Sequence, residues 1–355
     1  MEADVFSPVH IESSEVIRLL KRMYKSLIVA LCMLLLILDT KTAVNGAAEA
    51  VELCIRVLIP SLLPFFLVSV LLTNLLSGSS NIMRPIGTLL KIPQGAESLF
   101  LVGMLGGYPV GAQVICQAAE NGSLDKRDAS RMMAFCNNAG PAFLFGVIST
   151  QFPNMMYTWL IWAILVLSAI LTAVIFPGGS TKGIAIHNVK HITLTQAMEK
   201  SVTALSGVCA WVIIFRVILA FLERWFLWML PTAPHVAIQM LLELANGSIA
   251  LNEIQNIGLR FFVCTAGLSI GGFCVLLQTM SVNGTLGIGK YIPGKLIQTG
   301  ISLLLSIPMI YIVNNGISPL YMVAILLCFA PVIVILSHFR KKHQNKYGIP
   351  LPGGV

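Results

Sequence analysis

Two short stretches rich in glycine, proline and asparagine interrupt segments that are otherwise apolar. The first is Gly106-Gly107-Tyr108-Pro109 and the second runs from Phe135 to Pro141. Proline suits the first turn of a helix, so each stretch predicts that one helix ends and another restarts. Helix ends present backbone N–H groups to an anion, and carbonyls or asparagine amides to a cation or a polar ring. The alternative is that the glycines allow close helix packing and the prolines only kink the chain.

The second half of the chain places polar residues in similar surroundings. Glu243 and Asn246 are predicted to end one apolar segment, while Thr265, Ser269 and Gly271-Gly272 interrupt the next. A carboxylate inside a membrane is costly unless it is paired or faces water. Glu243 is therefore either a proton or cation site or an interfacial charge.

Arg216 raises the same question within an apolar stretch. It would contact a solute, pair with Glu243 or Glu223, or extend its charged group to the membrane surface. The sequence leaves these alternatives open.

The sequence gives little support for an enzyme. The sequence contains no GxSxG, HExxH or Walker motif, and His187, His191 and His235 lie in expected loops or helix ends. The eight cysteines fall in or beside apolar segments and resemble small hydrophobic residues more than ligands. We therefore expect no catalysis, cofactor or metal, and transport energy would come from a gradient or a partner.

The composition assigns the chain to a class. Hydrophobic residues make up 56% and charged residues only 11%, whereas soluble domains carry about 25% charged residues. Long apolar runs without alternation predict an all-α polytopic membrane protein. The net charge of +8 comes from short basic clusters beside apolar segments, which favours cytoplasmic loops over nucleic-acid binding. The expected partners are the lipid bilayer and a small-molecule solute, and a homo-oligomer stays open.

Basic residues precede the first apolar run and follow the last, so both termini are predicted to be cytoplasmic in the cell membrane. About eight transmembrane helices are expected, over residues 24–44, 58–76, 132–149, 157–176, 202–222, 259–280, 296–313 and 320–336. Residues 98–118 are flanked by basic residues on both sides, and 231–246 by loops poor in them. These two segments are predicted to be re-entrant, turning back inside the membrane.

An internal repeat accompanies this topology. An offset of 125 residues aligns Pro109 with Pro234 and the triplet Asn121-Gly122-Ser123 with Asn246-Gly247-Ser248. We interpret both triplets as helix ends. An odd number of crossings per unit would make the repeats inverted, a design typical of secondary transporters. The expected regions are an N-terminal tail and first helix (1–50), two repeats (51–180 and 200–315), and a last helix with a basic tail (316–355).

The predicted solute-binding residues come from these interrupted segments. They are Gly107, Tyr108, Pro109, Gly111, Gln113, Asn137, Asn138, Gly140, Pro141, Glu243, Asn246, Gly267 and Ser269.

Four stretches resemble the sporulation integral membrane protein family YlbJ/SpoVV, which has two nucleoside-recognition (Gate) domains. They are residues 60–66 (PSLLPFF), 107–112 (GYPVGA), 137–146 (NNAGPAFLFG) and 242–247 (LELANG). The resemblance implies transport of dipicolinic acid toward the forespore, with the outer forespore membrane as one location. Where the family pattern commonly has a basic residue after GYPxGA, this chain has Gln113.

Three classes of function compete. The first is a transporter for dipicolinate, or for a nucleoside-like or other metabolite. The second is a membrane assembly or signalling factor in sporulation that transports nothing. The third, an integral-membrane enzyme, is disfavoured because the sequence offers no catalytic set.

Overall fold

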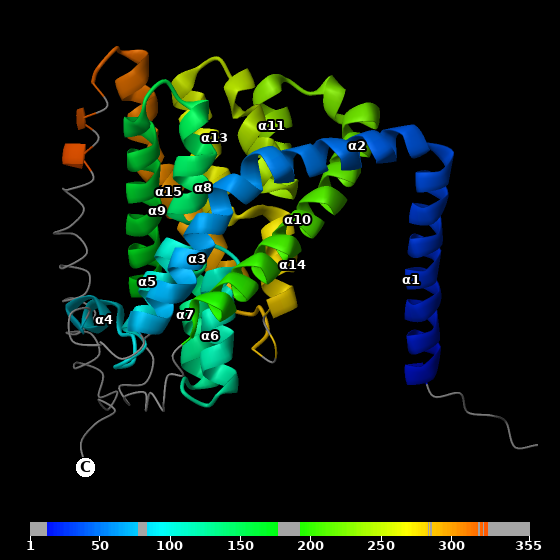
Figure 1. The fold of residues 1–355 in the computed structure, drawn as a ribbon. Coiled ribbons are helices and arrows are strands. Elements are labelled where there is room, and N and C mark those ends of the chain that lie inside the picture. The colour runs from blue at the N-terminus through cyan, green and yellow to red at the C-terminus, as the bar shows by residue number, and fades with distance from the viewer. Residues whose placement is uncertain are drawn as a thin grey trace, which may run out of the picture.

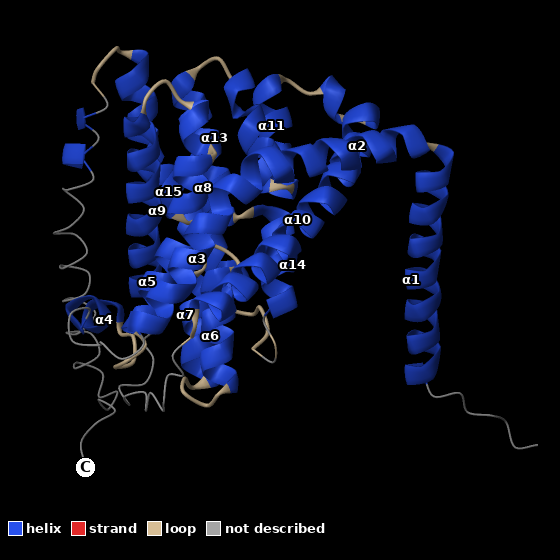
Figure 2. Cartoon of the chain, in the orientation of Figure 1, coloured by secondary structure: helices blue, strands red, loops and turns tan. Residues whose placement is uncertain are grey.

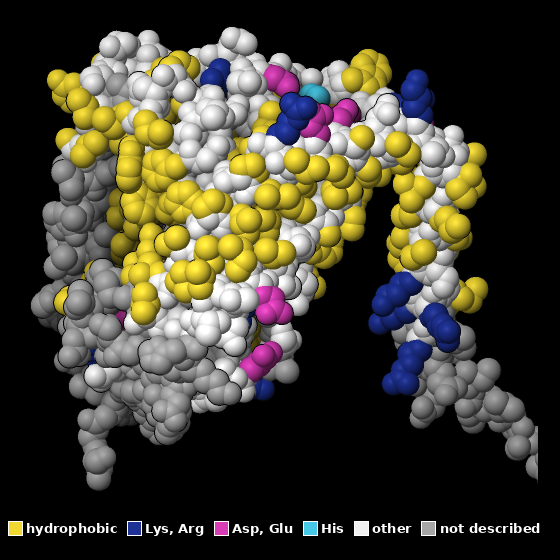
Figure 3. Space-filling model, viewed as in Figure 1, with side chains coloured by type: hydrophobic (Ala, Val, Ile, Leu, Met, Phe, Trp, Pro, Cys, Tyr) yellow, Lys and Arg dark blue, Asp and Glu magenta, His cyan; other side chains and the backbone are white. Residues whose placement is uncertain are grey.

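The computed structural model describes residues 13–76, 84–176, 192–282, 284, 286–318, 320–321 and 323–325. Every regular element in these residues is helical, and no strand occurs among them (Figures 1 and 2). Five helical segments within this part of the chain are long and apolar enough to cross a membrane: Thr40–Leu72, Met155–Ile175, Leu194–Trp225, Ile257–Val282 and Tyr291–Asn314. Apolar side chains cover much of the outer surface in Figure 3. The chain is a multi-pass, all-helical membrane protein.

The N-terminal region differs from the predicted boundaries. Helix α1 (Ser13–Leu38) stands apart from the other helices in Figure 1. A bent helical run follows, made of α2 (Thr40–Leu53), η1 (Cys54–Leu58) and α3 (Ile59–Leu76). Asp39 divides α1 from α2, because its side chain accepts the N–H of Thr42 and caps the new helix. The sequence predicted one span over 24–44 and the next over 58–76, but α2 joins them as a helix because it is rich in alanine, which favours helix despite its charged residues.

The first half of the bundle contains two interrupted helical pairs. Helices α5 and α6 are separated by Gly107-Tyr108-Pro109, and α7 and α8 by residues 137–140. The elements are α4 (Arg84–Leu90), α5 (Glu97–Gly106), α6 (Val110–Glu120), α7 (Lys126–Cys136), α8 (Pro141–Gly146), η2 (Ile148–Gln151) and α9 (Met155–Ile175). Both predicted breaks are confirmed, and Pro141 occupies the first turn of α8 as expected.

The second half also contains two interrupted helical pairs. A long helix comes first, then a pair broken at Glu243, a pair broken at Gly271-Gly272, and another long helix. The elements are α10 (Leu194–Trp225), η3 (Leu227–Met229), α11 (Thr232–Leu242), α12 (Leu244–Ala250), η4 (Leu251–Glu253), α13 (Ile257–Ile270), α14 (Gly272–Val282) and α15 (Tyr291–Asn314). The predicted last span, 320–336, and the basic tail lie mostly outside the described residues.

The 125-residue alignment does not pair equivalent breaks. Pro109 lies at the break before α6, whereas Pro234 lies within α11. The triplet Asn121-Gly122-Ser123 follows α6, as predicted for a helix end, but Asn246-Gly247-Ser248 lies inside α12. The second prediction was wrong because the Glu243 side chain caps a new helix three residues earlier, and that helix continues through the triplet.

Small residues let α5 and α6 approach α7. A Cβ atom on Gly103 or on Gly111 would overlap the carbonyl oxygen of Cys136. Arg131, on α7, then fixes this helix against its neighbours, since its guanidinium donates to the carbonyls of Leu90 (2.6 Å) and Ala173 (2.9 Å). Close backbone contact and a buried guanidinium thus hold the end of α7, where the break at 137–140 begins.

Candidate functional site

The two breaks of the first half touch each other. A Cβ atom built on Gly140 would lie 2.8 Å from the backbone N and Cα of Gly107. Gly107 also has φ +74° and ψ −176°, a conformation that is essentially restricted to glycine. The sequence predicted that both breaks are functional, and the structure brings their backbones into direct contact.

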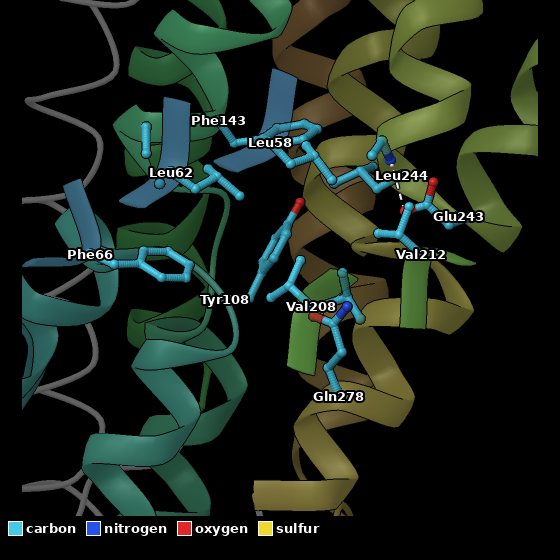
Figure 4. Close-up of a pocket in the computed structure, with 16 residues that line it drawn as sticks. Leu58, Leu62, Phe66, Tyr108, Phe143, Val208, Val212, Glu243, Leu244 and Gln278 are labelled. Carbon is cyan, nitrogen blue, oxygen red and sulfur yellow. Dashed lines mark hydrogen bonds between the residues drawn. The ribbon is translucent and has the colours of Figure 1, made fainter. Parts of the chain in front are cut away.

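A small cavity lies beside this contact, in the middle of the bundle (Figure 4). Its volume of about 50 Å³ has room for a few water molecules. Its walls come from both halves of the chain and are mainly apolar. The lining residues are Leu58, Leu62, Phe66, Gly106, Gly107, Tyr108, Gly140, Ala142, Phe143, Val208, Val212, Glu243, Leu244, Ala245, Val275 and Gln278.

Tyr108 supplies a polar group to this apolar space. Figure 4 shows its ring projecting between Phe66 and Leu62 on one side and Glu243 and Leu244 on the other. The hydroxyl oxygen is buried and has no hydrogen-bond partner among the described residues. An unsatisfied buried hydroxyl costs about 1–3 kcal/mol, which a bound solute with an acceptor atom would recover.

Glu243 lies at the break between α11 and α12 and lines the same cavity. Its carboxylate accepts the backbone N–H of Ala245 (2.9 Å) and of Asn246 (2.7 Å), and the Asn246 amide at 2.7 Å. The carboxylate therefore occupies the positive end of α12, where an anionic solute would otherwise bind. The sequence predicted that Glu243 ends a re-entrant segment, whereas it lies at the break between α11 and α12.

Asn137 ties the first break to the second half of the chain. Its side-chain oxygen accepts the N–H of Ala112 at 3.3 Å, in the first turn of α6. Its amide donates to the hydroxyl oxygens of Thr279 (3.0 Å) and Tyr291 (3.4 Å). The side chain is fully buried, so it satisfies a free N–H group at the start of α6 and fixes the break against α14 and α15.

Asn138 belongs to a buried cluster that the sequence analysis missed. The Lys295 ammonium donates to the side-chain oxygens of Asn138 and Gln298, each at 3.0 Å. Gln298 in turn donates to Asn138 at 2.7 Å. Lys295 directly precedes the predicted span 296–313, where a cytoplasmic loop was expected, but the residue is only 3% exposed.

A signal for this cluster was present in the sequence of α15. Polar residues recur there at helical spacing, and these residues are all buried: Tyr291, Lys295, Gln298, Ser302 and Ser306. A polar stripe in an apolar helix faces the interior of the bundle, because lipid cannot satisfy its hydrogen bonds.

A larger groove approaches the cavity along the N-terminal part of α10. Its volume is about 620 Å³, and its walls come from α6, α10 and α14. Gln113 and Pro109 line it together with Gln196, Glu199, Lys200, Thr203, Gly207 and Trp211. Val208 and Gln278 line both the groove and the cavity, so one layer of side chains separates the two spaces.

Ion pairs tie the C-terminal part of α10 to α2. Arg216 pairs with Glu49 of α2 at 2.5 Å and with Glu223 at 2.8 Å, and Glu223 also accepts from Gln239 of α11 at 2.8 Å. Arg224 pairs with Asp39 at 2.9 Å. In Figure 3, basic and acidic side chains lie close together at the upper edge of the apolar surface. Of the alternatives for Arg216, pairing with Glu223 is confirmed.

The remaining predicted residues have packing roles. Gly267 contacts Met240, since a Cβ atom there would lie 2.6 Å from the Met240 methyl. Ser269 donates to the carbonyl of Thr265 at 2.8 Å, and both lie within α13 and do not interrupt it. The interruption is at Gly271, with φ +82°, and Gly272, with φ +72°. Within the described residues, no group of three or more His, Cys, Asp or Glu side chains could hold a metal ion.

Comparison with known proteins gives a partial match. No protein family matches the chain, and no solved structure matches it significantly. The sporulation integral membrane protein YlbJ of Bacillus subtilis (strain 168) is 30% identical over 105 residues, which are 27% of this chain and 24% of that protein. The chain therefore matches about a quarter of the relative's length. It is a multi-pass membrane protein distantly related to a sporulation membrane protein.

Proposed function

We propose that the chain is a membrane transporter for a small polar or anionic solute, with dipicolinic acid as the first candidate. The observation that carries this proposal is the groove that leads to the central cavity at the two touching breaks. Beyond the cavity, ion pairs hold the C-terminal part of α10 against its neighbours. A pathway open on one side of a central site and closed on the other is what alternating access requires. The central cavity holds only a few waters in this state, so solute binding would require the walls to move.

The same proposal includes inverted repeats, eight spans and two re-entrant pairs, α5–α6 and α11–α12. Both halves contain two interrupted pairs followed by a long helix, although α4 has no counterpart in the second half, and Figure 1 places α6 and α11 at opposite ends of the bundle. Interrupted helices that meet near the midplane from opposite faces form the binding sites of many secondary transporters. The distant relationship to a sporulation membrane protein supports dipicolinate, a planar aromatic dicarboxylate, and an outer forespore location.

Labelling from one face of the membrane tests the inverted topology. Lys126 and Asn252 are exposed at the α6–α7 turn and in η4. We expect Lys126→Cys and Asn252→Cys to react with an impermeant maleimide from opposite faces, in a background with Cys32 and Cys328 replaced by serine. Reaction of both from the same face would exclude inverted repeats.

Uptake by vesicles tests the binding site. Tyr108→Phe removes only a hydroxyl that has no protein partner in the described residues, so stability should not fall. If the hydroxyl donates to a carboxylate of the solute, its loss costs about 1.5–3 kcal/mol, or roughly tenfold or more in uptake of labelled dipicolinate at low concentration. Tyr311→Phe, at an exposed position on α15, is the matched control and should transport normally. Equal uptake by all three proteins would remove Tyr108 from the site.

Glu243→Gln separates the two candidate solutes. The carboxylate lines the cavity, so removing its charge relieves repulsion of a dicarboxylate, and we expect the KM for dipicolinate to fall by up to about tenfold. A nucleoside-like solute would instead donate hydroxyl groups to the carboxylate, and its uptake would weaken. Glu253→Gln, on the exposed turn η4, is the control. A tenfold loss of dipicolinate uptake by a folded Glu243→Gln protein would contradict an anionic solute.

A non-transporting assembly factor is the second candidate. Its supporting observation is the partial match to a protein that is named for sporulation and membrane integration alone. Vesicles that take up neither dipicolinate nor nucleosides would favour it.

A further inference from the structure

Within the part of the chain that the structure describes, the Lys295 ammonium forms no ion pair with an acidic side chain. The residue is 3% exposed, in the middle of a bundle that crosses the membrane. An ammonium in such a place is costly, and intramembrane charges of this kind are generally functional. The groups that bind the ammonium therefore indicate what kind of site it occupies.

Those ligands are neutral oxygens around a helix end. The ammonium donates to the side-chain oxygens of Asn138 and Gln298. Behind Gln298 lie the carbonyl of Leu165 and the hydroxyl of Ser168, each 3.4 Å from its amide nitrogen. The two oxygens that accept from the ammonium are thus both amide oxygens, which are among the ligands that proteins offer to hard cations.

The end of α7 adds a favourable field. This helix ends at Cys136, and Asn138 bonds back to the carbonyl of Phe135 at 2.8 Å. Gly294, next to Lys295, packs so closely on α7 that a Cβ atom would lie 2.5 Å from the carbonyl oxygen of Ala134. The negative end of the α7 dipole thus faces the segment that carries the ammonium. Unwound carbonyls and half-helix C-termini are where transporters place coupling cations.

We propose that the Lys295 ammonium is a tethered cation that fills a cation site at the break between α7 and α8, so that the protein works without a bound alkali metal ion. The ammonium supplies the positive charge that a bound sodium ion would supply, and it holds the break in place through Asn138. The site is separate from the cavity lining, although it adjoins it through Gly140.

Melting temperatures in different salts test this site without any transport. The purified full chain is compared in sodium, potassium and choline chloride at equal ionic strength. The unsubstituted protein should show no sodium-specific shift. In Lys295→Ala the oxygens are left around a vacated space, and a sodium or potassium ion should stabilise the protein by about 3 °C at roughly tenfold its Kd. Lys290→Ala, which removes a neighbouring charge at the start of α15, is the matched control.

Each outcome decides the proposal. A saturable, sodium-specific stabilisation of the unsubstituted protein would overturn it, and this measurement does not depend on any variant folding. No difference between Lys295→Ala and Lys290→Ala would also overturn it. A flux measurement, which rests on the proposed transport function, should give equal dipicolinate uptake in sodium and choline. Absence of any uptake would count against transport alone, because the melting temperatures decide the cation site.

Discussion

Gly107→Ala is expected to lower the free energy of unfolding by about 3 kcal/mol or more and to abolish transport. The backbone conformation of Gly107 costs a non-glycine residue about 1–3 kcal/mol. In addition, a Cβ atom there would lie 2.7 Å from the backbone nitrogen of Gly140, and relieving such crowding typically costs another 1–3 kcal/mol. The two breaks would have to separate, which changes the cavity that both of them line.

Gly122→Ala is the matched control for this variant. Gly122 has φ +70°, but a Cβ atom there would meet nothing within 4 Å. It therefore carries the backbone cost of about 1 kcal/mol without the crowding. Thermal melting in detergent and dipicolinate uptake should both distinguish the two proteins. If the two variants lose equal stability, the contact between Gly107 and Gly140 is not what holds the breaks together.

Gly207→Phe is expected to reduce uptake by more than tenfold while the protein stays folded. Gly207 lines the groove, and a Cβ atom there meets nothing within 4 Å, so a large side chain has room to enter the groove. A phenyl group in this space would obstruct the route toward Val208 and Gln278, the side chains between the groove and the cavity. The reduction should appear in the maximal rate and in counterflow alike, because entry itself is blocked.

Gly300→Phe makes the same substitution at a position outside the groove and serves as the control. Gly300 lies on α15, is exposed, and also has nothing within 4 Å of an added Cβ atom. Its uptake should match that of the unsubstituted protein, and both variants should melt within a few degrees of it. Unchanged uptake by Gly207→Phe would mean that the groove is not the entry route.

The Gly107→Ala and Gly207→Phe proteins distinguish a transporter from an assembly factor. A transporter requires both a flexible contact between the breaks and an open groove, whereas an assembly factor requires only a folded surface. If Gly207→Phe loses sporulation function but keeps a normal melting temperature, the result would therefore support transport. Loss of sporulation function with normal transport rates would favour a partner surface elsewhere on the chain.

The amino-acid sequence alone determined the class of the protein and the positions of three breaks, but not that of the break at Glu243. Hydropathy predicted helices, since lipid admits only helices and closed barrels, and the apolar runs lack the alternation of barrel strands. Gly107-Tyr108-Pro109, the stretch from Asn137 to Pro141, and Gly271-Gly272 marked real interruptions, because the conformations of glycine and proline are local properties. The same local signals failed at Asn246-Gly247-Ser248, where the capping carboxylate of Glu243 set the helix boundary.

Only the tertiary structure decided which groups meet. Lys295 and Asn138 are 157 positions apart in the chain, and Arg216 and Glu49 are 167 apart. No local pattern encodes such pairs, because they depend on how α15 packs on α7 and how α10 packs on α2. Taken singly, a basic residue near an apolar segment looks the same in the sequence whether it lies in a loop or inside the bundle, and only the polar stripe of α15 hints at the second. Burial separates the two, and burial is a property of the packed helices.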